Sequence, residues 1–551
     1  MNMVIREYLS MLKESGELDA LVPDLLLAMG IEPLSKPQVG VRQFGVDVAA
    51  VGPDPEDNDQ VKLFLITIKQ GDLDRNSWDN DTPQAVRPSL NEIQDVYIPG
   101  HVLPEHVTLP KKIIVCCNGD KKPNVHENWK GLIERYFLDE YLFPEDTRKL
   151  LRKTIALADQ NEDEPRYFYE LVETILFKSD LPIESIAPAK RARRRALGLL
   201  NLSLNIVFHW CQEAENLRPA LLCAEHTVLV TWDWARQSNL FDCESTMEGL
   251  EGLYRTYLKI SATLVQKLLS ICFVRDGFFI QAQHDLHYPL LTFEVIGILA
   301  TCSLANHLIA ATISSDSGKE QFMKRAAVTA QALAELLKNN PAAHTPLYDS
   351  HAVDIALGLL TLYCMRVHQT AREWVEQLAH RIHFAYQLGR MYPIASDSFE
   401  DLVAIKYEKD IPKEKLMDLS TLLPMLAHWF AILGMNEPYQ QFQKNVTTTF
   451  AKTNLQLWYP DASTDQVLYR TNAGRESGMT LASIELPKDI EELRTEILRL
   501  NKLQEEVISN LSCMNQGVLI LPLLASRHFR TPVIPWFWQS LISEEISEAT
   551  Q

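Results

Sequence analysis

The sequence lacks the glycine-rich motifs that hold phosphates and the motifs of common hydrolases. Ser317-Gly318-Lys319 has no upstream glycine, so it does not make a P-loop. A dinucleotide-binding fingerprint and a G-x-S-x-G nucleophile elbow are also missing. We therefore do not expect the chain to hydrolyse nucleotides by itself, and any NTPase activity would belong to a partner protein.

Paired cysteines are missing as well. The nine cysteines are odd in number and scattered, and none has C-x-x-C spacing. This pattern argues against a disulfide framework and a structural zinc site. Most of the cysteines lie in apolar runs, where a thiol behaves as a small hydrophobic group. We expect a reducing, cytoplasmic environment.

Long hydrophobic runs free of polar residues are scarce. The first eleven residues contain Arg6 and Glu7, so they do not resemble a signal peptide. The best membrane candidate is Pro289–Ile313, but it contains Glu294, Asn306 and His307. Because burying these groups in lipid is costly, we predict a buried helix of a helical domain and no membrane association.

Positive charge is also in short supply. The chain has 53 Lys and Arg against 72 Asp and Glu, a net charge of −19. The whole protein should repel nucleic acid, so any nucleic-acid contact needs a local basic patch. The densest patch is KRARRR, which starts a predicted helix although cations there oppose the helix dipole. It indicates either an anionic partner or a solvated patch that pairs with the acidic residues 161–164. The candidate nucleic-acid-binding residues are Lys190, Arg191, Arg193, Arg194 and Arg195.

The length of 551 residues exceeds what one hydrophobic core supports, so several domains are expected. Strand patterns occur mainly before residue 125, and helical spacing dominates afterwards. We predict an α+β protein in three parts: an α/β domain over 1–140, a helical linker over 141–190 and an all-α region over 191–551. The long helices are expected at 192–217, 221–238, 249–273, 289–313, 320–338, 351–390 and 417–452, with a small hairpin within 455–486.

The first domain shows a helical pattern over residues 4–30, which Gly16 and Pro23 divide and Gly30 ends. Two strands, Val41–Val51 and Val61–Gln70, follow on either side of the turn-forming run GPDPEDNDQ and predict an antiparallel hairpin. A helix is expected over 84–98. The apolar run Lys112–Cys117 is typical of a fully buried central strand.

The hairpin contains the residues best suited to chemistry. Thr67 and Lys69 share one face of their strand, and Asp47 on the partner strand can lie near both. Oxygen ligands of this kind bind Mg²⁺ or Mn²⁺, which activates a water, and a lysine stabilises developing negative charge. The alternative is that Asp47 pairs locally and Lys69 is a solvated strand end. Because aspartate is depleted in strand interiors and costly to bury alone, we favour the functional interpretation.

These segments, GVDVAAVG and LFLITIKQGD, resemble the PD-(D/E)xK nuclease superfamily, and most closely its Mrr-type and restriction-endonuclease-like members. The resemblance covers about residues 14–120. In that family a helix precedes a strand bearing aspartate, and the next strand ends in acid-x-Lys. The resemblance implies that Asp47 binds metal, that Lys69 is catalytic and that Gln70 is the polar residue that often follows it. An acid on the first helix, here Glu17 or Asp19, commonly completes the site.

The resemblance departs from the family at Thr67, where an acidic residue or glutamine is usual. It implies a restriction-endonuclease-like domain that cleaves DNA with Mg²⁺ or Mn²⁺, or else a degenerate scaffold that binds without cutting. By analogy with nucleases joined to helical regions, we expect an effector of prokaryotic antiviral defence. Its expected partners are DNA, a partner protein such as an NTPase, and a second copy of the chain.

The loop after Lys69 adds further candidates for nucleic-acid binding. Arg75 and Arg87 can contact backbone phosphates, and Trp78 can stack on a base. Loop packing and surface ion pairs are the alternative explanation for each of them.

Overall fold

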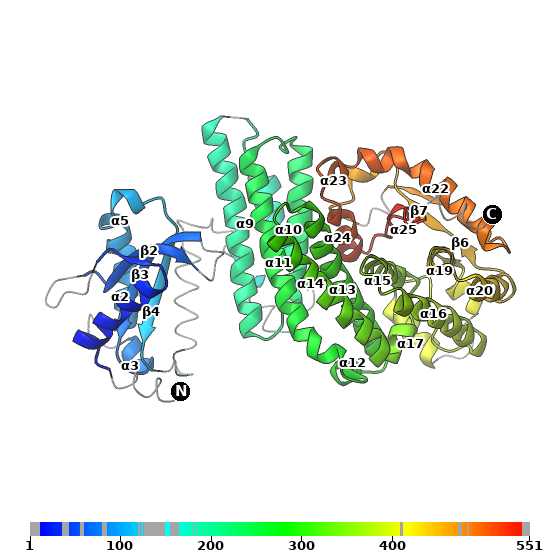
Figure 1. Cartoon of the computed structure of the whole chain (residues 1–551), viewed down its shortest axis with the longest axis horizontal. Coiled ribbons are helices and arrows are strands. Elements are labelled where there is room, and N and C mark those ends of the chain that lie inside the picture. Colours follow the sequence, from blue (N-terminus) through cyan, green and yellow to red (C-terminus); the bar gives the residue numbers. More distant parts are fainter. Residues whose placement is uncertain are drawn as a thin grey trace. The chain divides into compact units, whose positions relative to one another are not determined.

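The computed structural model describes residues 12–35, 43–54, 60–79, 85–119, 122, 125, 149–151, 153–154, 165–179, 181–184, 186–407, 412–471, 477–481 and 484–542. The chain divides into two compact units, Met1–Pro144 and Glu145–Gln551. The first is a mixed α/β unit and the second is almost wholly helical (Figure 1). The protein is therefore α+β with a large helical region.

A four-stranded sheet forms the centre of the N-terminal unit. Its strands are β1 (Glu32–Pro33), β2 (Val48–Asp54), β3 (Gln60–Lys69) and β4 (Lys111–Cys117), in that spatial order. β2 and β3 form the predicted antiparallel hairpin, and β4 is parallel to β3. A parallel neighbour needs a crossover connection. The helical segments α3 (Arg75–Trp78), α4 (Val86–Glu92), η2 (Ile93–Tyr97), α5 (Ile98–Gly100) and η3 (Pro104–His106) lie within it.

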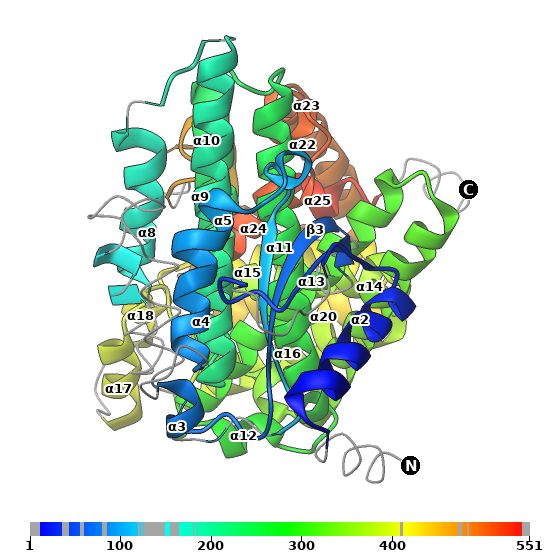
Figure 2. The ribbon, with the colours of Figure 1, turned by 90° about the vertical axis from the view of Figure 1, so that its left-hand side faces the viewer.

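Strand β3 is buried on both faces because its side chains alternate between two cores. Leu63 and Leu65 belong to a core with α4, which includes Val86 and Leu90. Phe64, Ile66 and Ile68 belong to a second core with Leu18, Val22 and Leu26 of η1 (Glu14–Leu18) and α2 (Asp19–Ala28). Figure 2 shows α2 and α4 on opposite sides of β3.

The first strand of the hairpin begins later than predicted, at Val48 instead of Val41. The chain turns just before it, with positive φ angles of 50° at Phe44 and 81° at Gly45. A Cβ atom on Gly45 would lie 2.0 Å from the carbonyl oxygen of Ser89 in α4. Only glycine suits this turn and this close approach, so the extended pattern read from the sequence stops there.

Two other details of this unit differ from the predictions. Gly16, with a φ of 83°, interrupts the first helical segment as expected, but α2 continues through Pro23. Strand β4 lies at the edge of the sheet among the described strands, and each of its residues is half-buried. The apolar run alone did not show whether a neighbouring strand lay on one side or on both.

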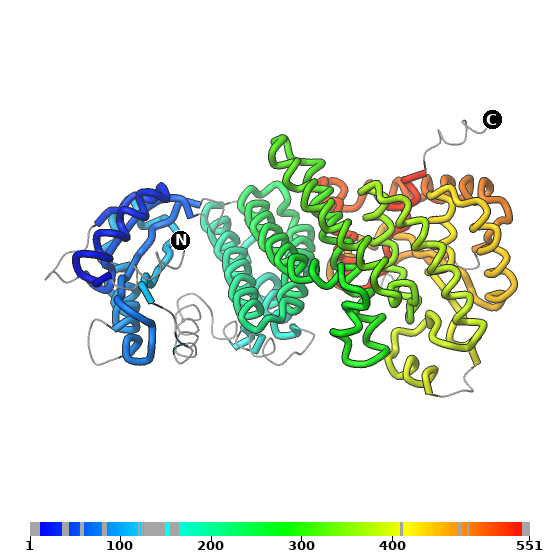
Figure 3. The backbone as a smooth tube through the Cα atoms, turned by 60° about the horizontal axis from the view of Figure 1, so that its bottom comes forward, coloured from blue at the N-terminus to red at the C-terminus, as the bar shows by residue number. Residues whose placement is uncertain are grey.

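The helical unit is built from consecutive helices that pack on one another (Figure 3). The predicted ranges 351–390 and 417–452 each contain two main helices, because short turns interrupt them. The first range contains α15 (Ala352–Cys364) and α16 (His368–Leu388), and the second contains α19 (Leu422–Ile432) and α20 (Asn436–Thr449). The predicted hairpin is formed by the antiparallel strands β7 (Leu457–Tyr459) and β8 (Met479–Leu481). A second pair, β5 (Leu419–Ser420) and β6 (Asn454–Leu455), is parallel.

The helices and short helical turns of this unit have the following bounds: α8 (Arg166–Glu173), η4 (Thr174–Lys178), α9 (Ala187–Glu213), α10 (Arg218–Gln237), α11 (Glu244–Cys272), α12 (Gly277–Gln281), α13 (His287–Thr312), α14 (Asp316–Asn339), η5 (Pro341–His344), η6 (Asp349–His351), α15 (Ala352–Cys364), α16 (His368–Leu388), α17 (Phe399–Tyr407), α18 (Lys413–Leu416), α19 (Leu422–Ile432), α20 (Asn436–Thr449), η7 (Thr464–Gln466), α22 (Ile490–Asn510), α23 (Ser512–Asn515), α24 (Ile520–Phe529) and α25 (Trp536–Gln539).

Helix α13 contains the segment considered as a membrane candidate. Among the described residues it is the one helix long and apolar enough to cross a membrane, and 72% of its most apolar window is buried inside the protein. It packs against α11, α14, α15 and α24. The apolar side chains of α13 therefore form part of the core of the helical unit, as predicted.

The predicted linker 141–190 does not stand apart from the helical unit. In its described part, α8 packs against α10, and Phe168, Leu171 and Val172 of α8 are fully buried. Apolar residues at helical spacing require a surface to pack on, and α10 provides it. This part of the chain belongs to the core of the second unit.

Helix α24, the second last helix of the described chain, packs on α10 and α13. Arg527 donates from Nε to Glu225 Oε1 at 2.8 Å, and His528 Nδ1 lies 3.2 Å from Oε2 of the same carboxylate. Burial acts to raise the pKa of Glu225, but the charge of Arg527 and the contacts with His528 lower it overall. A buried charge is costly without a partner, so Glu225 and Arg527 each require the other. Their ion pair holds α24 against α10, although the two residues lie about 300 positions apart in the sequence.

Next to this ion pair lies His226, which stacks on Tyr169 with ring centroids 3.9 Å apart. Neither ring nitrogen of His226 has a hydrogen-bond partner within the described part of the chain. Burial, followed by the charges of His528 and Arg470, lowers the pKa of His226 well below 6.5. The imidazole is therefore kept neutral and acts as an aromatic packing group between α8 and α10.

Replacement of His226 by phenylalanine is expected to reduce the loss of stability in acid. Because its pKa is lowered in the folded state, His226 binds more protons when the chain is unfolded, and the folded state loses stability as the pH falls below about 6.5. The loss approaches about 1.4 kcal/mol per pH unit. Urea unfolding at neutral pH and at about pH 5 measures it, with the exposed His380→Phe as control. Equal acid slopes in the wild type and His226→Phe would contradict the assignment.

Candidate functional site

Asp47 lies immediately before β2, at the end of the sheet where β3 finishes. Its backbone N–H donates to the carbonyl oxygen of Ile66 at 2.8 Å. Its carboxylate oxygen Oδ2 accepts the backbone N–H of Ile68 at 2.6 Å. Asp47 Oδ2 therefore adds one hydrogen bond to those between β2 and β3, in the position that a backbone carbonyl would otherwise take. In the described part of the chain the other oxygen, Oδ1, has no hydrogen-bond partner, so it is available to a ligand.

Thr67 holds the same carboxylate from the neighbouring position. It is fully buried, and its hydroxyl donates to Asp47 Oδ2 at 3.2 Å. Because the hydroxyl proton is directed at the carboxylate, Thr67 orients Asp47. The sequence predicted that these residues meet, and the structure brings them into contact. It gives Thr67 a positioning role in addition to the predicted one of an oxygen ligand.

Lys69 is the last residue of β3 and shares the face of Thr67 by strand alternation. Its side chain is half-buried, and its ammonium has neither a hydrogen bond nor an ion pair with the residues that the structure describes. A lysine at this position can therefore interact with an external anion. The next residue, Gln70, is exposed and contacts Glu14: Gln70 N donates to Glu14 Oε2 at 3.2 Å.

The two predicted helix acids differ in their surroundings. Burial is the main cause of a raised pKa at Asp19, and the charge of Asp47 raises it further against a hydrogen bond from the Gly16 backbone. Asp19 therefore lies within electrostatic reach of Asp47. Glu17 instead accepts the backbone N–H of Lys13 at 2.7 Å and caps its own segment. Of the two, Asp19 is the acid that can complete the site.

Two residues at this end of the sheet were missed in the sequence. Glu14 holds η1 against the end of β3 through Gln70. Asn118, directly after β4, accepts the N–H of Gly71 at 2.6 Å and donates to the carbonyl oxygen of Leu12 at 2.8 Å. A polar residue immediately after a buried strand was the available signal for Asn118. Together these contacts connect the segment before α2 to the ends of β3 and β4.

The donor set suits a cation that needs few protein ligands. Among the described residues, no group of three or more His, Cys, Asp or Glu side chains lies close enough to hold a metal ion. Mg²⁺ keeps several waters and binds through one or two carboxylates. Asp47 Oδ1 and the Asp19 carboxylate fit that requirement, whereas they would not provide a closed zinc site.

Comparisons with protein-family models, curated proteins and solved structures found no match to the chain.

The three candidates in the loop after Lys69 are placed differently from one another. Arg75 is exposed at the start of α3. Arg87 forms an ion pair with Asp79 at 2.6 Å, as the alternative explanation supposed. Trp78 is only 2% exposed and packs in the core with Leu90 and Val86. The expectation that Trp78 stacks on a base is therefore wrong for this conformation, because its ring has no free face.

The cations of the basic run KRARRR lie on different faces of helix α9, so one is buried and the others are exposed. Arg193 is fully buried and donates to the carbonyl oxygens of Pro182 and Glu184 at 2.6 and 3.0 Å. It also donates to Cys243 Sγ at 3.3 Å, and its prediction as a nucleic-acid contact is therefore wrong. Burial acts to raise the pKa of Cys243, but hydrogen bonds from Ser245, Arg193 and Thr246 lower it to about 6. A thiolate at Cys243 would offset the charge of the buried guanidinium.

The other four cations of the run are exposed: Lys190, Arg191, Arg194 and Arg195. Arg194 forms an ion pair with Glu248 of α11 at 2.7 Å, and the acidic stretch 161–164 lies outside the described residues. A helical run of six residues cannot point all its side chains outward, so one of them became part of the core. The exposed members remain candidates for an anionic partner.

Substitutions of the acids should separate their roles in metal binding. Asp47→Asn and Asp19→Asn are each expected to weaken Mn²⁺ binding by at least about tenfold, because each removes an anionic ligand. Glu17→Gln should bind Mn²⁺ like the wild type, since its carboxylate caps the backbone N–H of Lys13. Titration calorimetry with Mn²⁺ measures all three. An effect of Glu17→Gln equal to that of Asp19→Asn would refute this assignment.

Thr67→Val tests the positioning role of the hydroxyl. Valine keeps the shape but removes the hydrogen bond to Asp47, so we expect a loss of about 1–2 kcal/mol in the free energy of unfolding. Mn²⁺ affinity should fall severalfold, whereas Thr67→Ser should retain it. Urea unfolding and calorimetry measure the two effects. If Thr67→Val binds Mn²⁺ as well as the serine variant does, the hydroxyl does not position Asp47.

Proposed function

We propose that the N-terminal unit is a metal-dependent endonuclease that cleaves phosphodiester bonds in DNA. The observation that supports it is the combination of a carboxylate oxygen and an ammonium group, on Asp47 and Lys69, that have no partners in the described part of the chain. Thr67 lies between them in the sheet and holds the carboxylate in place. Both side chains are half-buried at the same strand end, so these two open groups are accessible to a ligand.

The proposed chemistry assigns one task to each residue. A Mg²⁺ or Mn²⁺ ion bound at the site would lower the pKa of a water and offset charge on the phosphate. Asp47 and Asp19 supply the anionic ligands for that ion. Lys69 donates to a phosphate oxygen and stabilises its developing negative charge. Thr67 and the Ile68 N–H fix the orientation of Asp47, which reduces the cost of ordering the site.

The arrangement of the elements also supports this proposal. Helix α2 precedes the aspartate at the start of β2, and β3 ends in Thr-Ile-Lys, which is the order implied by the PD-(D/E)xK resemblance. We therefore propose a restriction-endonuclease-like domain. Arg75 and the exposed part of the basic run, above all Lys190 and Arg191, are the proposed contacts to DNA phosphates. The helical unit is proposed to bind a trigger, a partner such as an NTPase, or a second copy of the chain, in an antiviral effector.

A specific observation favours the alternative of a degenerate scaffold. Thr67 replaces an acidic residue, and Oδ2 of Asp47 is used by the backbone and by that hydroxyl. The protein would then bind nucleic acid or a partner protein without cutting. Metal dependence separates the two functions, because only the nuclease needs Mg²⁺ or Mn²⁺ for activity.

The test is cleavage of plasmid and linear DNA with Mg²⁺ or Mn²⁺ by wild type, Asp47→Asn and Lys69→Met. We expect each substitution to reduce the rate by at least about a hundredfold, because each removes a group that acts on the reacting phosphate. Matched controls are Glu17→Gln, whose carboxylate caps its own segment, and Lys111→Met. Lys111 pairs with Leu63, several residues from the Lys69 end of β3.

Metal-dependent cutting that the two site variants lose and the controls retain would support the nuclease. Cutting that persists undiminished in both site variants would show that the site is wrong. DNA binding without cutting by the wild type in either metal would favour the scaffold.

A further inference from the structure

A cavity of about 900 Å³ lies within the helical unit, away from the residues discussed above. Its walls come from the start of α13, the turn η5, the end of α16, and the helices α17 and α18. Arg381 and Leu388, seven residues apart on α16, both line it, as expected for one helix face. A volume of this size is typical of sites for small organic ligands.

The charge of the lining is opposite to that of the protein. Among the residues that the structure describes, its charged side chains are four cations and one carboxylate: Arg381, Arg390, Lys406, Lys413 and Asp285. The chain as a whole has a net charge of −19. Several cations around one concave site make its electrostatic potential positive, and this favours the binding of an anionic ligand.

Two of the four cations already have partners. Lys406 forms an ion pair with Asp285 at 3.0 Å. Lys413 donates to the carbonyl oxygens of Tyr386 and Gln387 at 2.8 and 3.1 Å and so satisfies the end of α16. A Cβ atom on Gly389, whose φ is 62°, would lie 3.0 Å from Lys413 Cε, so this approach suits glycine.

The two arginines have no such partners. Arg381 and Arg390 are exposed, and neither guanidinium forms a hydrogen bond or an ion pair with the residues that the structure describes. A guanidinium presents five N–H donors in a planar fork that matches phosphate oxygens. Two open guanidinium groups beside two further cations suit an anion with more than one negative charge.

Apart from Thr345, the remaining walls are apolar or aromatic. They include Leu286, Leu347 and Ile405, together with Tyr288 and Tyr392. Burial, followed by the charges of Tyr386 and Glu414, raises the pKa of Tyr392 to about 12, so its phenol stays neutral and adds no negative charge. These surfaces exceed what an inorganic anion needs, and they can contact an organic group.

We propose that this cavity binds a small organic phosphate, with Arg381 and Arg390 contacting the phosphate groups and the apolar wall contacting the organic part. Lys406 and Lys413 add positive charge from their present positions. The inference is independent of the proposed nuclease activity, because binding is measured without DNA. It identifies a ligand class for the helical unit, whose own function the sequence left open.

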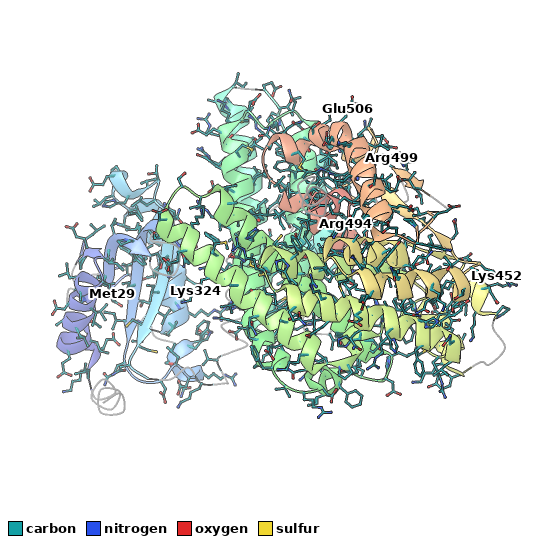
Figure 4. All side chains as sticks on the ribbon, turned by 45° about the vertical axis from the view of Figure 1, so that its right-hand side comes forward. Met29, Lys324, Lys452, Arg494, Arg499 and Glu506 are labelled. Atoms are coloured by element: carbon teal, nitrogen blue, oxygen red, sulfur yellow. The ribbon has the colours of Figure 1, made fainter. Side chains whose placement is uncertain are left out.

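The experiment is calorimetric titration of the full chain with pyrophosphate and with ATP, both without added metal. We expect saturable binding of both probes, and a loss of at least about tenfold in affinity in the double variant Arg381→Ala/Arg390→Ala, because charge-assisted hydrogen bonds are removed. The matched control is Arg255→Ala/Lys324→Ala, which removes two exposed cations from α11 and α14 (Figure 4 labels Lys324).

A second measurement keeps the test independent of folding in the variants. Phenylglyoxal modifies accessible arginines, and peptide mapping of the wild type reports each site. Pyrophosphate should protect Arg381 and Arg390 and leave Arg255 modified. Absence of saturable binding by both probes, equal affinity in the two double variants, or no protection of the two arginines would each overturn the proposal.

Discussion

The hydrogen bond from the backbone N–H of Ile68 to Asp47 Oδ2 fixes the end of the sheet on which the candidate site depends. Buried N–H groups must be paired, and at this position the side chain of Asp47 takes the place of a strand carbonyl. That contact sets the register in which Asp47 faces Thr67, and it leaves the other carboxylate oxygen unengaged. The same bond therefore fixes the chain at the start of β2 and presents a possible ligand atom at the end of β3.

The two ends of β3 illustrate different solutions to the same problem of buried charge. At its start, Asp54 is 2% exposed and forms ion pairs with Lys62 and Lys112 at 3.0 and 2.9 Å, so its charge is compensated within the sheet. At its other end, Asp47 has hydrogen bonds but no cation among the described residues, and Lys69 has no anion. Both side chains are half-buried, so their charges are only partly solvated and a bound ligand would stabilise them.

The fold was largely predictable where local pattern decides it. The hairpin, the helix after it and most long helices follow from alternation or helical spacing, because each element must bury its own apolar face. The errors arose where distant residues intervene. The turn at Gly45 depends on the backbone of Ser89, and the burial of Trp78 depends on α4. At the site, Asp47, Thr67 and Lys69 follow from strand geometry. The choice of Asp19 over Glu17 required the position of η1 relative to the sheet.

The sequence by itself determined that the chain has a small α/β part and a long helical part, and that Asp47, Thr67 and Lys69 share one end of a hairpin. Both follow from periods of two and 3.6 residues, which are local properties of the backbone. Only the tertiary structure decided which charges remain open. Arg193 is buried against carbonyl oxygens and Cys243, whereas Arg381 and Arg390 line a cavity. All three are arginines on or next to helices, and only their distant neighbours distinguish a core cation from a binding residue.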